Sequence, residues 1–206
     1  MRIGLLTKSA PQAPGFSHGE DVSNLEDSLQ LDRRKVLQLL DQLAGGLERR
    51  NVKAEMFVVG GAAIILAYDS ERITYDVDAL FEPKNIVYDE ARRVAAENFI
   101  QPDWLNDAVK IHLIGDDPQA AVAYRNKWLT VSIGSPKYLL AMKLASARPE
   151  NDVDDIRLLL DHCDYPLDVS VEAIFDDLQR NWPVTGKLFL PKSHYILQDI
   201  LAERQR

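Results

Sequence analysis

Apolar residues in the first half of the chain switch between helical and strand-like spacing. From Asp32 they recur three and four positions apart among charged residues, which is typical of an amphipathic helix. The run from Met56 to Val59 is continuously apolar and ends in two glycines, which is typical of a buried strand followed by a tight turn. This half of the chain therefore predicts helix, strand, helix, strand and helix, at residues 32–47, 56–59, 62–68, 74–81 and 87–98.

The second half of the chain predicts one hairpin followed by helices. Residues 104–114 are compatible with either a helix or a strand, and the turn residues at 115–118 follow them. Two strand-prone runs around Asn126-Lys127 predict a hairpin over residues 120–133. Beyond the hairpin, helices are predicted to start at the N-cap signal Ser135-Pro136, to start again at the N-cap Asn151, and to cover 169–181 and 192–204.

These elements predict an α+β fold, in which a small mixed β-sheet is flanked by helices and followed by a helical C-terminal region. The chain has 206 residues and is 46% apolar, which is enough to build a sizeable core. The N-terminal residues are rich in Ser, Pro, Gly and acids without periodicity. We therefore expect a flexible arm at 1–28, an α/β core at 29–134 and a helical region at 135–206.

Composition and charge narrow the classes of function. The net charge of −8 makes the surface as a whole repel nucleic acid, so such a contact needs a basic patch. Arginine pairs at 33–34, 49–50 and 92–93 are either that patch or solvated helix faces. Cys163 is the only cysteine, and the four histidines lack zinc-ligand spacing. Neither a membrane-spanning run nor a signal peptide is evident, so we expect a cytoplasmic protein without a membrane partner.

Asp76 and Asp78 stand in the strand-prone run TYDVDALF, where aspartate is normally depleted. Residues two apart on a strand point to the same face, so both carboxylates are expected to project together. Such carboxylates can hold the divalent ions that serve phosphoryl and nucleotidyl transfer. We therefore predict that Asp76 and Asp78 bind Mg²⁺, or Mn²⁺ in its place. The plainer alternative is an edge strand that carries solvated charges.

The Gly60-Gly61 pair lies between the first predicted strand and the next helix. Glycines let the backbone approach a ligand closely, and the start of a helix has N–H groups available to phosphate oxygens. A tight turn without a ligand explains two glycines equally well. The order of strand, Gly-Gly, helix and a second strand with Asp-x-Asp predicts one pocket for a nucleoside triphosphate and its metal.

This order of motifs resembles the nucleotidyltransferase superfamily with the DNA polymerase β type fold, whose motif is Gly-Gly or Gly-Ser followed by Asp-x-Asp or Asp-x-Glu. The runs VVGGAA, RITYDVD and LLAMKLASARPENDVDDI further resemble bacterial nucleotidyltransferase-like proteins related to the AbiEii toxins. The resemblance covers roughly Val52 to Leu160. It implies catalytic and metal-binding roles for the two aspartates and nucleotide binding by a further set, Gly60, Gly61, Arg72 and Thr74. Arg72 would meet a phosphate with two parallel N–H groups, or is a surface arginine.

A later motif, Lys…Arg…Asp…Asp, matches the same relatives. The resemblance implies that Lys143 contacts the triphosphate and that Arg148, Asp152 and Asp155 are accessory site residues. The two aspartates also have a plainer explanation, because acids in the first turn of a helix are favoured by its dipole. Asn151 stands where the relatives often carry a basic residue, so this part of the match is imperfect.

A third metal-binding acid is not evident. The superfamily usually places one on a neighbouring strand, yet the predicted hairpin strands contain none. Asp107, Asp116 and Asp117 are the candidates to supply it from a loop or a helix end. Either one of these residues completes the metal site, or the site is built differently.

Two functions follow for this chain. The first is a magnesium-dependent nucleotidyltransferase that moves a nucleoside monophosphate from a triphosphate to RNA or protein; by resemblance, it is a toxin with a cognate antitoxin. The second is a catalytically degenerate nucleotide-binding or regulatory module with the same fold, which the missing third acid favours. A glycosyltransferase also uses Asp-x-Asp, but normally after a larger sheet than the single strand and two helices that precede it here.

Overall fold

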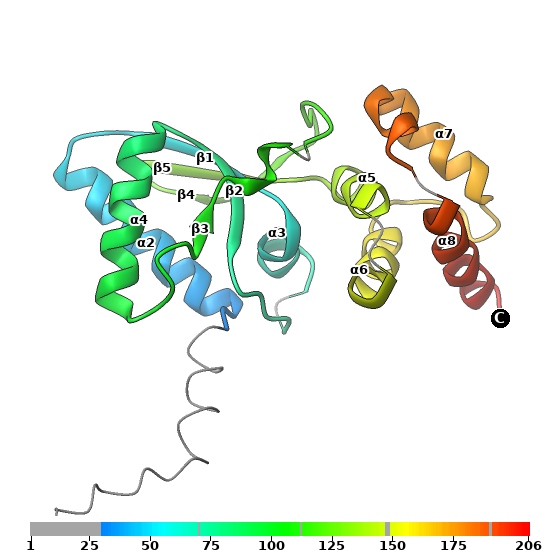
Figure 1. Cartoon of the computed structure of the whole chain (residues 1–206), viewed down its shortest axis with the longest axis horizontal. Helices are drawn as coiled ribbons and strands as arrows, with labels where there is room; N and C mark the ends of the chain where they lie inside the picture. Colours follow the sequence, from blue (N-terminus) through cyan, green and yellow to red (C-terminus); the bar gives the residue numbers. More distant parts are fainter. Residues whose placement is uncertain (1–29, 70, 112, 147–148, 190) are drawn as a thin grey trace, which may run out of the picture.

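A computed structural model describes residues 30–69, 71–111, 113–146, 149–189 and 191–206, and the predicted arm at 1–28 lies outside them. The α+β prediction is confirmed (Figure 1). The helices are α2 (Arg33–Arg49), α3 (Gly60–Ala67), α4 (Lys84–Asn98), α5 (Pro136–Ser146), α6 (Pro149–Asp161), α7 (Val171–Asn181), α8 (Pro191–Arg204) and the 3₁₀ turns η1 (Ala108–Ile111) and η2 (Pro183–Lys187). The strands are β1 (Ala54–Val58), β2 (Val77–Glu82), β3 (Leu105–Asn106), β4 (Ala121–Arg125) and β5 (Leu129–Ile133).

The five strands form one mixed sheet in the order β3-β2-β1-β5-β4. β1 lies at its centre, antiparallel to β2 and parallel to β5. The predicted hairpin is confirmed as the antiparallel pair β4 and β5, with an irregularity between Val122 and Tyr124. The central strands β1 and β5 alternate buried residues with less buried ones, and their apolar side chains join the core.

The first residue of β2 differs from the prediction. β2 starts at Val77 rather than at residue 74, and the backbone of Thr74 instead exchanges two hydrogen bonds with Leu31 in an isolated bridge. The prediction that both aspartates lie on this strand is therefore wrong for Asp76, which precedes it. The ambiguous region 104–114 contains both kinds of structure, namely the two-residue strand β3 followed by η1. β3 runs parallel to the start of β2 and so forms the edge of the sheet beside the two aspartates.

The helix-start signals were right in one case and wrong in the other. α5 begins at Pro136, and the backbone N–H of Tyr138 lies 3.4 Å from Ser135 Oγ, as expected of a serine N-cap. Asn151 is not the N-cap of α6, because that helix already begins at Pro149. Proline suits the first turn of a helix, since its missing N–H has no partner there in any case.

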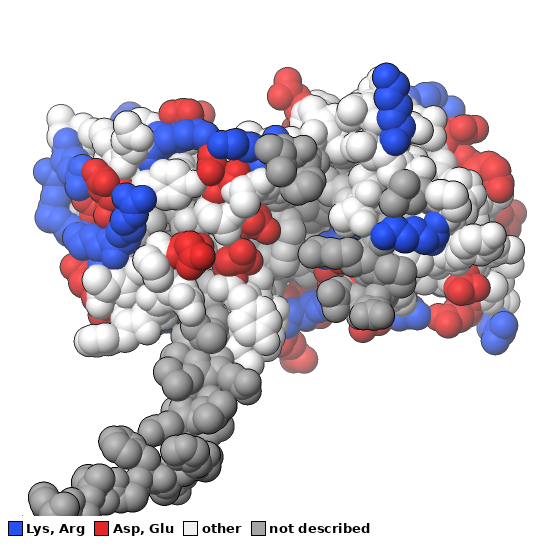
Figure 2. All heavy atoms as spheres, viewed as in Figure 1, with Lys and Arg blue, Asp and Glu red and all other residues white. Residues whose placement is uncertain are grey.

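α2 continues through both of its glycines, and one of them, Gly46, lies where α4 packs closely against the helix. A Cβ at Gly46 would lie 1.9 Å from Glu90 Oε2. Glu90 is only 4% exposed and accepts hydrogen bonds from Arg50 Nε at 2.6 Å and Arg93 Nε at 2.7 Å. Burial acts to raise the pKa of Glu90, but the two arginines outweigh it and hold that pKa below its ordinary value. Basic side chains accordingly surround acidic ones at the α2–α4 end of the molecule (Figure 2).

The helices α5 to α8 lie together on one side of the molecule, and the sheet with α2, α3 and α4 lies on the other (Figure 1). Tyr138 of α5 joins the two sides, because its ring packs edge-on against Phe57 of β1 and Trp182, with ring centres 5.5 and 5.3 Å away. The boundaries of the three predicted domains stay a prediction. No helix within the described part of the chain is long and apolar enough to cross a membrane.

Candidate functional site

Asp78 of β2 lies against the first residue of α3. Gly60 has a φ of +66°, a backbone conformation that residues with a side chain adopt only with strain. A Cβ at Gly60 would lie 3.3 Å from Asp78 Oδ2 and 3.9 Å from its Cβ. Gly60 is therefore required for its conformation and for the close approach of Asp78. The structure thus brings the first glycine of the pair against the second aspartate of the Asp-x-Asp motif.

Gly61 lies against Thr74 in the same way. A Cβ at Gly61 would lie 2.7 Å from Thr74 Oγ1, so the second glycine is required by this contact rather than by a positive φ. Val59, which precedes α3, has no side-chain hydrogen bond to the first N–H groups of the helix. The positive end of a helix dipole and such N–H groups are suited to binding an anion.

Asp76 is held by an asparagine that the sequence analysis did not identify. Asn106 Nδ2 donates a hydrogen bond to Asp76 Oδ2 at 3.1 Å, while Asn106 Oδ1 accepts one from the backbone N–H of Ala108 at 3.0 Å. A carboxylate needs a donor and an N–H needs an acceptor, so both contacts agree on how the amide is oriented. Burial raises the pKa of Asp76, the hydrogen bond from Asn106 opposes that rise, and the charge of Asp103 adds to it.

Asn106 also stands beside Asp78, because the two residues are paired in the parallel register of β2 and β3. Paired residues of neighbouring strands share a face, so the asparagine occupies the neighbouring-strand position where a third acid was sought. Among the described residues, no three of His, Cys, Asp and Glu come together in a group that could hold a metal ion. The sequence pattern was used to look for a third acid, and Asn106 is an amide. It also lies in a strand of two residues, which is too short to show periodicity.

Two of the three acids proposed for that position have other partners for their carboxylates, and a role of any of the three at the metal site stays a prediction. Asp107 accepts hydrogen bonds from Lys84 Nζ at 2.5 Å and Tyr88 Oη at 2.6 Å. The hydrogen bond from Lys84 is the main reason why the pKa of Asp107 falls to about 2. Asp117 accepts from Ser135 N at 2.6 Å and so anchors the start of α5, and the backbone oxygen of Asp116 accepts from a tryptophan ring.

The later motif forms an ion-pair network beside the core. Lys143 Nζ lies 2.8 Å from Asp152 Oδ1 and 2.7 Å from Asp155 Oδ2, and Asp155 also pairs with Arg72. The structure thus brings Arg72 into contact with the later motif, a pairing that the sequence did not predict. Contact of Lys143 or Arg72 with a nucleotide stays a prediction. Arg148 lies outside the described residues.

Asp76 and Asp78 are suitable ligands for one divalent cation that arrives with a nucleotide. Mg²⁺ is commonly bound by one or two carboxylates together with substrate phosphates, and it keeps several waters. Acidic side chains gather on the molecular face over β2 and β3 (Figure 2), which favours a cation there.

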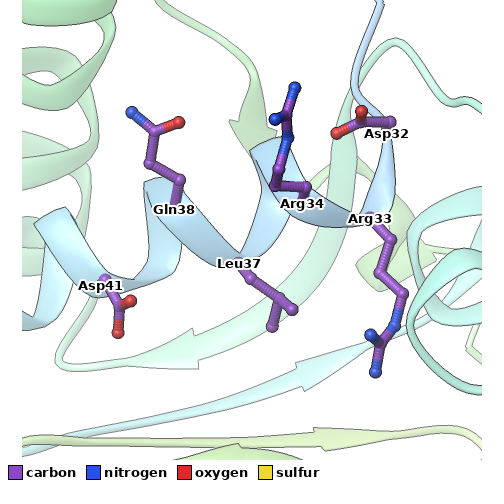
Figure 3. Close-up of a pocket in the computed structure, with 6 residues that line it drawn as sticks. All are labelled: Asp32, Arg33, Arg34, Leu37, Gln38 and Asp41. Carbon is purple, nitrogen blue, oxygen red and sulfur yellow. The ribbon is translucent and has the colours of Figure 1, made fainter.

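A separate hollow of about 580 Å³ follows α2. Its lining residues all come from the first half of this helix and its cap, and Arg33, Leu37 and Asp41 lie on one side of the helix while Arg34 and Gln38 lie on the other (Figure 3). Asp32, which also lines the hollow, is occupied as the N-cap that accepts a hydrogen bond from the N–H of Lys35 at 2.6 Å. This hollow contains neither glycine of the Gly-Gly pair and neither aspartate of the Asp-x-Asp motif.

Comparison with known proteins gives one match to a protein family. A family model described as nucleotidyltransferase of unknown function (DUF6036) matches residues 35–177. The match includes the glycine pair, the two aspartates and the ion-pair network. No curated protein and no solved structure matches the chain significantly. Since the family model covers more than half of the chain, the chain belongs to this family of nucleotidyltransferases of unknown function.

Proposed function

We propose that this protein is a magnesium-dependent nucleotidyltransferase that moves a nucleoside monophosphate from a nucleoside triphosphate to a hydroxyl group on RNA or protein. The observation that carries the proposal is the contact between Gly60 and Asp78. It brings a helix start of the kind that suits a phosphate within a few ångströms of a carboxylate suited to a divalent cation. A triphosphate and its metal need these two features side by side.

The backbone N–H groups at Gly60, Gly61 and the start of α3 receive the phosphates, since Val59 offers them no side-chain hydrogen bond. Asp76 and Asp78 would hold Mg²⁺ or Mn²⁺. When bound there, the ion neutralises the phosphate charge and acts as a Lewis acid. Asn106 keeps the Asp76 carboxylate in position through its N–H donor. These residues orient the α-phosphate for attack.

In the reaction, the oxygen of the acceptor hydroxyl forms a bond to the α-phosphorus. The bond from that phosphorus to the oxygen bridging to the β-phosphate breaks, pyrophosphate leaves, and the hydroxyl proton passes to solvent. The protein contributes positioning and electrostatic stabilisation rather than a covalent intermediate. The family match supports the reaction class, and the acceptor belongs to the proposal alone.

A second candidate function is a nucleotide-binding regulatory module that has lost catalysis. Asn106 favours it, because an amide stands beside Asp76 and Asp78 where a third acid would help to fix two metal ions. In this function the protein binds a magnesium nucleotide and transmits its presence to a partner. Nucleotide binding is common to both functions, so turnover distinguishes them.

Triphosphates labelled at the α-phosphate test the proposal. Incubation with Mg²⁺ or Mn²⁺ and total cellular RNA or protein should label an acceptor, and Asp78→Asn should abolish the label. Asp89→Asn is the matched control, because Asp89 is an exposed acid of α4 and should leave labelling unchanged. Magnesium-dependent nucleotide binding with no labelled acceptor for any of the four nucleotides would favour the regulatory module.

The proposed role as a toxin with a cognate antitoxin is supported by the sequence resemblance to the AbiEii-related proteins. Expression of the wild-type chain alone should arrest bacterial growth, and expression of Asp78→Asn at the same level should not. Equal growth arrest by both proteins would contradict a toxin whose action depends on nucleotide transfer.

A further inference from the structure

One carboxylate, that of Asp155, joins two cations that come from distant parts of the chain. Asp155 Oδ1 pairs with Arg72 Nη1, and Asp155 Oδ2 lies 2.7 Å from Lys143 Nζ. Arg72 belongs to the segment between α3 and β2, whereas Lys143 and Asp155 belong to α5 and α6. The helical side of the molecule therefore holds a side chain of the Gly-Gly/Asp-x-Asp half through this ion pair.

The network is too buried to be a set of solvated surface charges. Asp152 is 0% exposed and Asp155 is 9% exposed, and Asp152 also receives a hydrogen bond from Ser146 Oγ at 3.3 Å. Two buried carboxylates need cationic partners, and two cations so close together need carboxylates between them. Arg72 and Lys143 supply such partners for Asp155, and Lys143 supplies one for Asp152, so these positions constrain one another.

Arg72 belongs to the segment of the chain that leads into the residues of the site. It precedes Thr74, Asp76 and Asp78 at intervals of two residues, and the first and last of these three face Gly61 and Gly60. α6 and α3 come close to each other at their C-terminal ends, because the ring of His162, which follows α6, lies 5.1 Å from that of Tyr68, which follows α3. The Arg72 guanidinium has five N–H donors, more than one carboxylate oxygen can accept, and it remains partly exposed.

We propose that Asp155 is a positioning residue through which the helical side completes the triphosphate site. By bridging Arg72 and Lys143, it holds two cations side by side in the orientation that receives the phosphates. The inference rests on the proposed function and adds to it the source of the phosphate-binding cations. Asp155 itself touches neither nucleotide nor metal in this role; it acts through Arg72.

Calorimetric titration of each of the four nucleoside triphosphates with Mg²⁺ tests the proposal. Arg72→Gln should weaken binding by about tenfold or more, the usual effect of losing a charge-assisted hydrogen bond. Asp155→Asn should weaken it by about tenfold as well, and the loss in the double variant should be smaller than the product of the two single losses. Asp154→Asn is the matched control on the same helix, because Asp154 is exposed and pairs only with Arg157 among the contacts shown, so binding should not change.

The sign of the Asp155→Asn effect distinguishes positioning from simple neutralisation. If Asp155 only neutralises the two cations, its removal frees them and binding tightens, which overturns the proposal. Asp155→Glu keeps the charge while displacing the carboxylate, so it should also weaken binding and serves if Asp155→Asn fails to fold. A melting curve for each variant shows whether the protein is folded at the titration temperature.

Failure of this inference is distinguishable from failure of the proposed function. Binding that is lost in Asp78→Asn but unchanged in Arg72→Gln and Asp155→Asn overturns the positioning role and leaves the metal site intact. Binding that is lost in Arg72→Gln and Asp155→Asn but unchanged in Asp78→Asn supports the positioning role and overturns the metal assignment. A wild-type protein that binds no magnesium nucleotide contradicts both.

Discussion

The side-chain amide of Asn106 donates a hydrogen bond of 3.1 Å to the carboxylate of Asp76. Asn106 is also the register partner of Asp78, so this one residue adjoins both predicted metal ligands. An asparagine in this position stabilises the carboxylate of Asp76 through its N–H donor. It supplies no negative charge when a metal ion binds.

Asn106→Asp should make the metal-free protein less stable and its stability more dependent on metal. The change replaces a donor by a third carboxylate, and this should lower the free energy of unfolding by about 1–2 kcal/mol. Addition of Mn²⁺ or Mg²⁺ should recover the lost stability, because a ligand that binds only the folded state stabilises that state. Melting temperatures with and without each ion measure both effects.

Asn126→Asp is the control for this prediction, since Asn126 lies in the β4–β5 turn and its Oδ1 accepts from the N–H groups of Trp128 and Leu129. An aspartate preserves these two contacts. Equal gains in melting temperature on adding metal to the wild type and to Asn106→Asp would show that the residue at 106 lies outside the metal site.

Gly61→Ala should destabilise the protein by about 1–3 kcal/mol, because the new Cβ would lie 2.7 Å from Thr74 Oγ1. In a Thr74→Ala background the nearest remaining Thr74 atom is the Cβ at 3.3 Å, so most of this effect should disappear. Urea denaturation of the two single variants and the double variant measures the coupling. If the loss is the same in both backgrounds, Thr74 does not determine the requirement for glycine at 61.

Glu90→Gln should reduce the free energy of unfolding at neutral pH by about 2 kcal/mol, since it removes the charge that pairs with Arg50 and Arg93. The pKa of Glu90 is lowered in the folded protein, so its stabilising contribution is present above the unfolded pKa of about 4.3 and is lost as the pH falls through the folded pKa. The variant should therefore lose stability less steeply in acid.

Glu97→Gln is the matched control, because Glu97 pairs with the same Arg93 from an exposed position on α4. This variant should change stability by less than about 1 kcal/mol. Denaturation series over the acidic range compare the three proteins. Parallel pH profiles for the wild type and Glu90→Gln would contradict the role assigned to Glu90.

Asp76→Asn should stabilise the metal-free protein at neutral pH while weakening its magnesium-dependent nucleotide binding. The pKa of Asp76 is raised in the folded state by burial, so its ionised form is unfavourable above that pKa, and the penalty vanishes as the pH falls through it. The stability difference between variant and wild type should shrink accordingly in acid. Lower stability of Asp76→Asn at neutral pH would contradict this account.

Local patterns in the sequence predicted much of the fold and half of the site. The run ending in Gly60-Gly61 and the spacing of Asp76 and Asp78 were sufficient to expect a helix start beside two carboxylates, because neighbouring strands in a sheet bring such residues together. Thr74 was assigned to the second strand incorrectly, since its backbone pairs with Leu31, and sequence spacing does not reveal that pairing.

The remaining contacts of the site depend on which distant elements meet. Asn106 stands in a strand of two residues, so no periodicity could identify its face or its partner. Arg72, Lys143 and Asp155 are brought together by the packing of α5 and α6 beside the core, and their separation along the chain carries no such information. Predicting these contacts requires the tertiary arrangement.

A crystal structure of the protein with Mn²⁺ and a nonhydrolysable nucleoside triphosphate tests the central claim most directly, because manganese is located by its anomalous scattering. We predict a manganese peak coordinated by Asp76 and Asp78, with the triphosphate at the Gly60-Gly61 start of α3. Manganese or nucleotide bound elsewhere, such as in the hollow along α2, with neither present between Gly61 and Asp78, would contradict it.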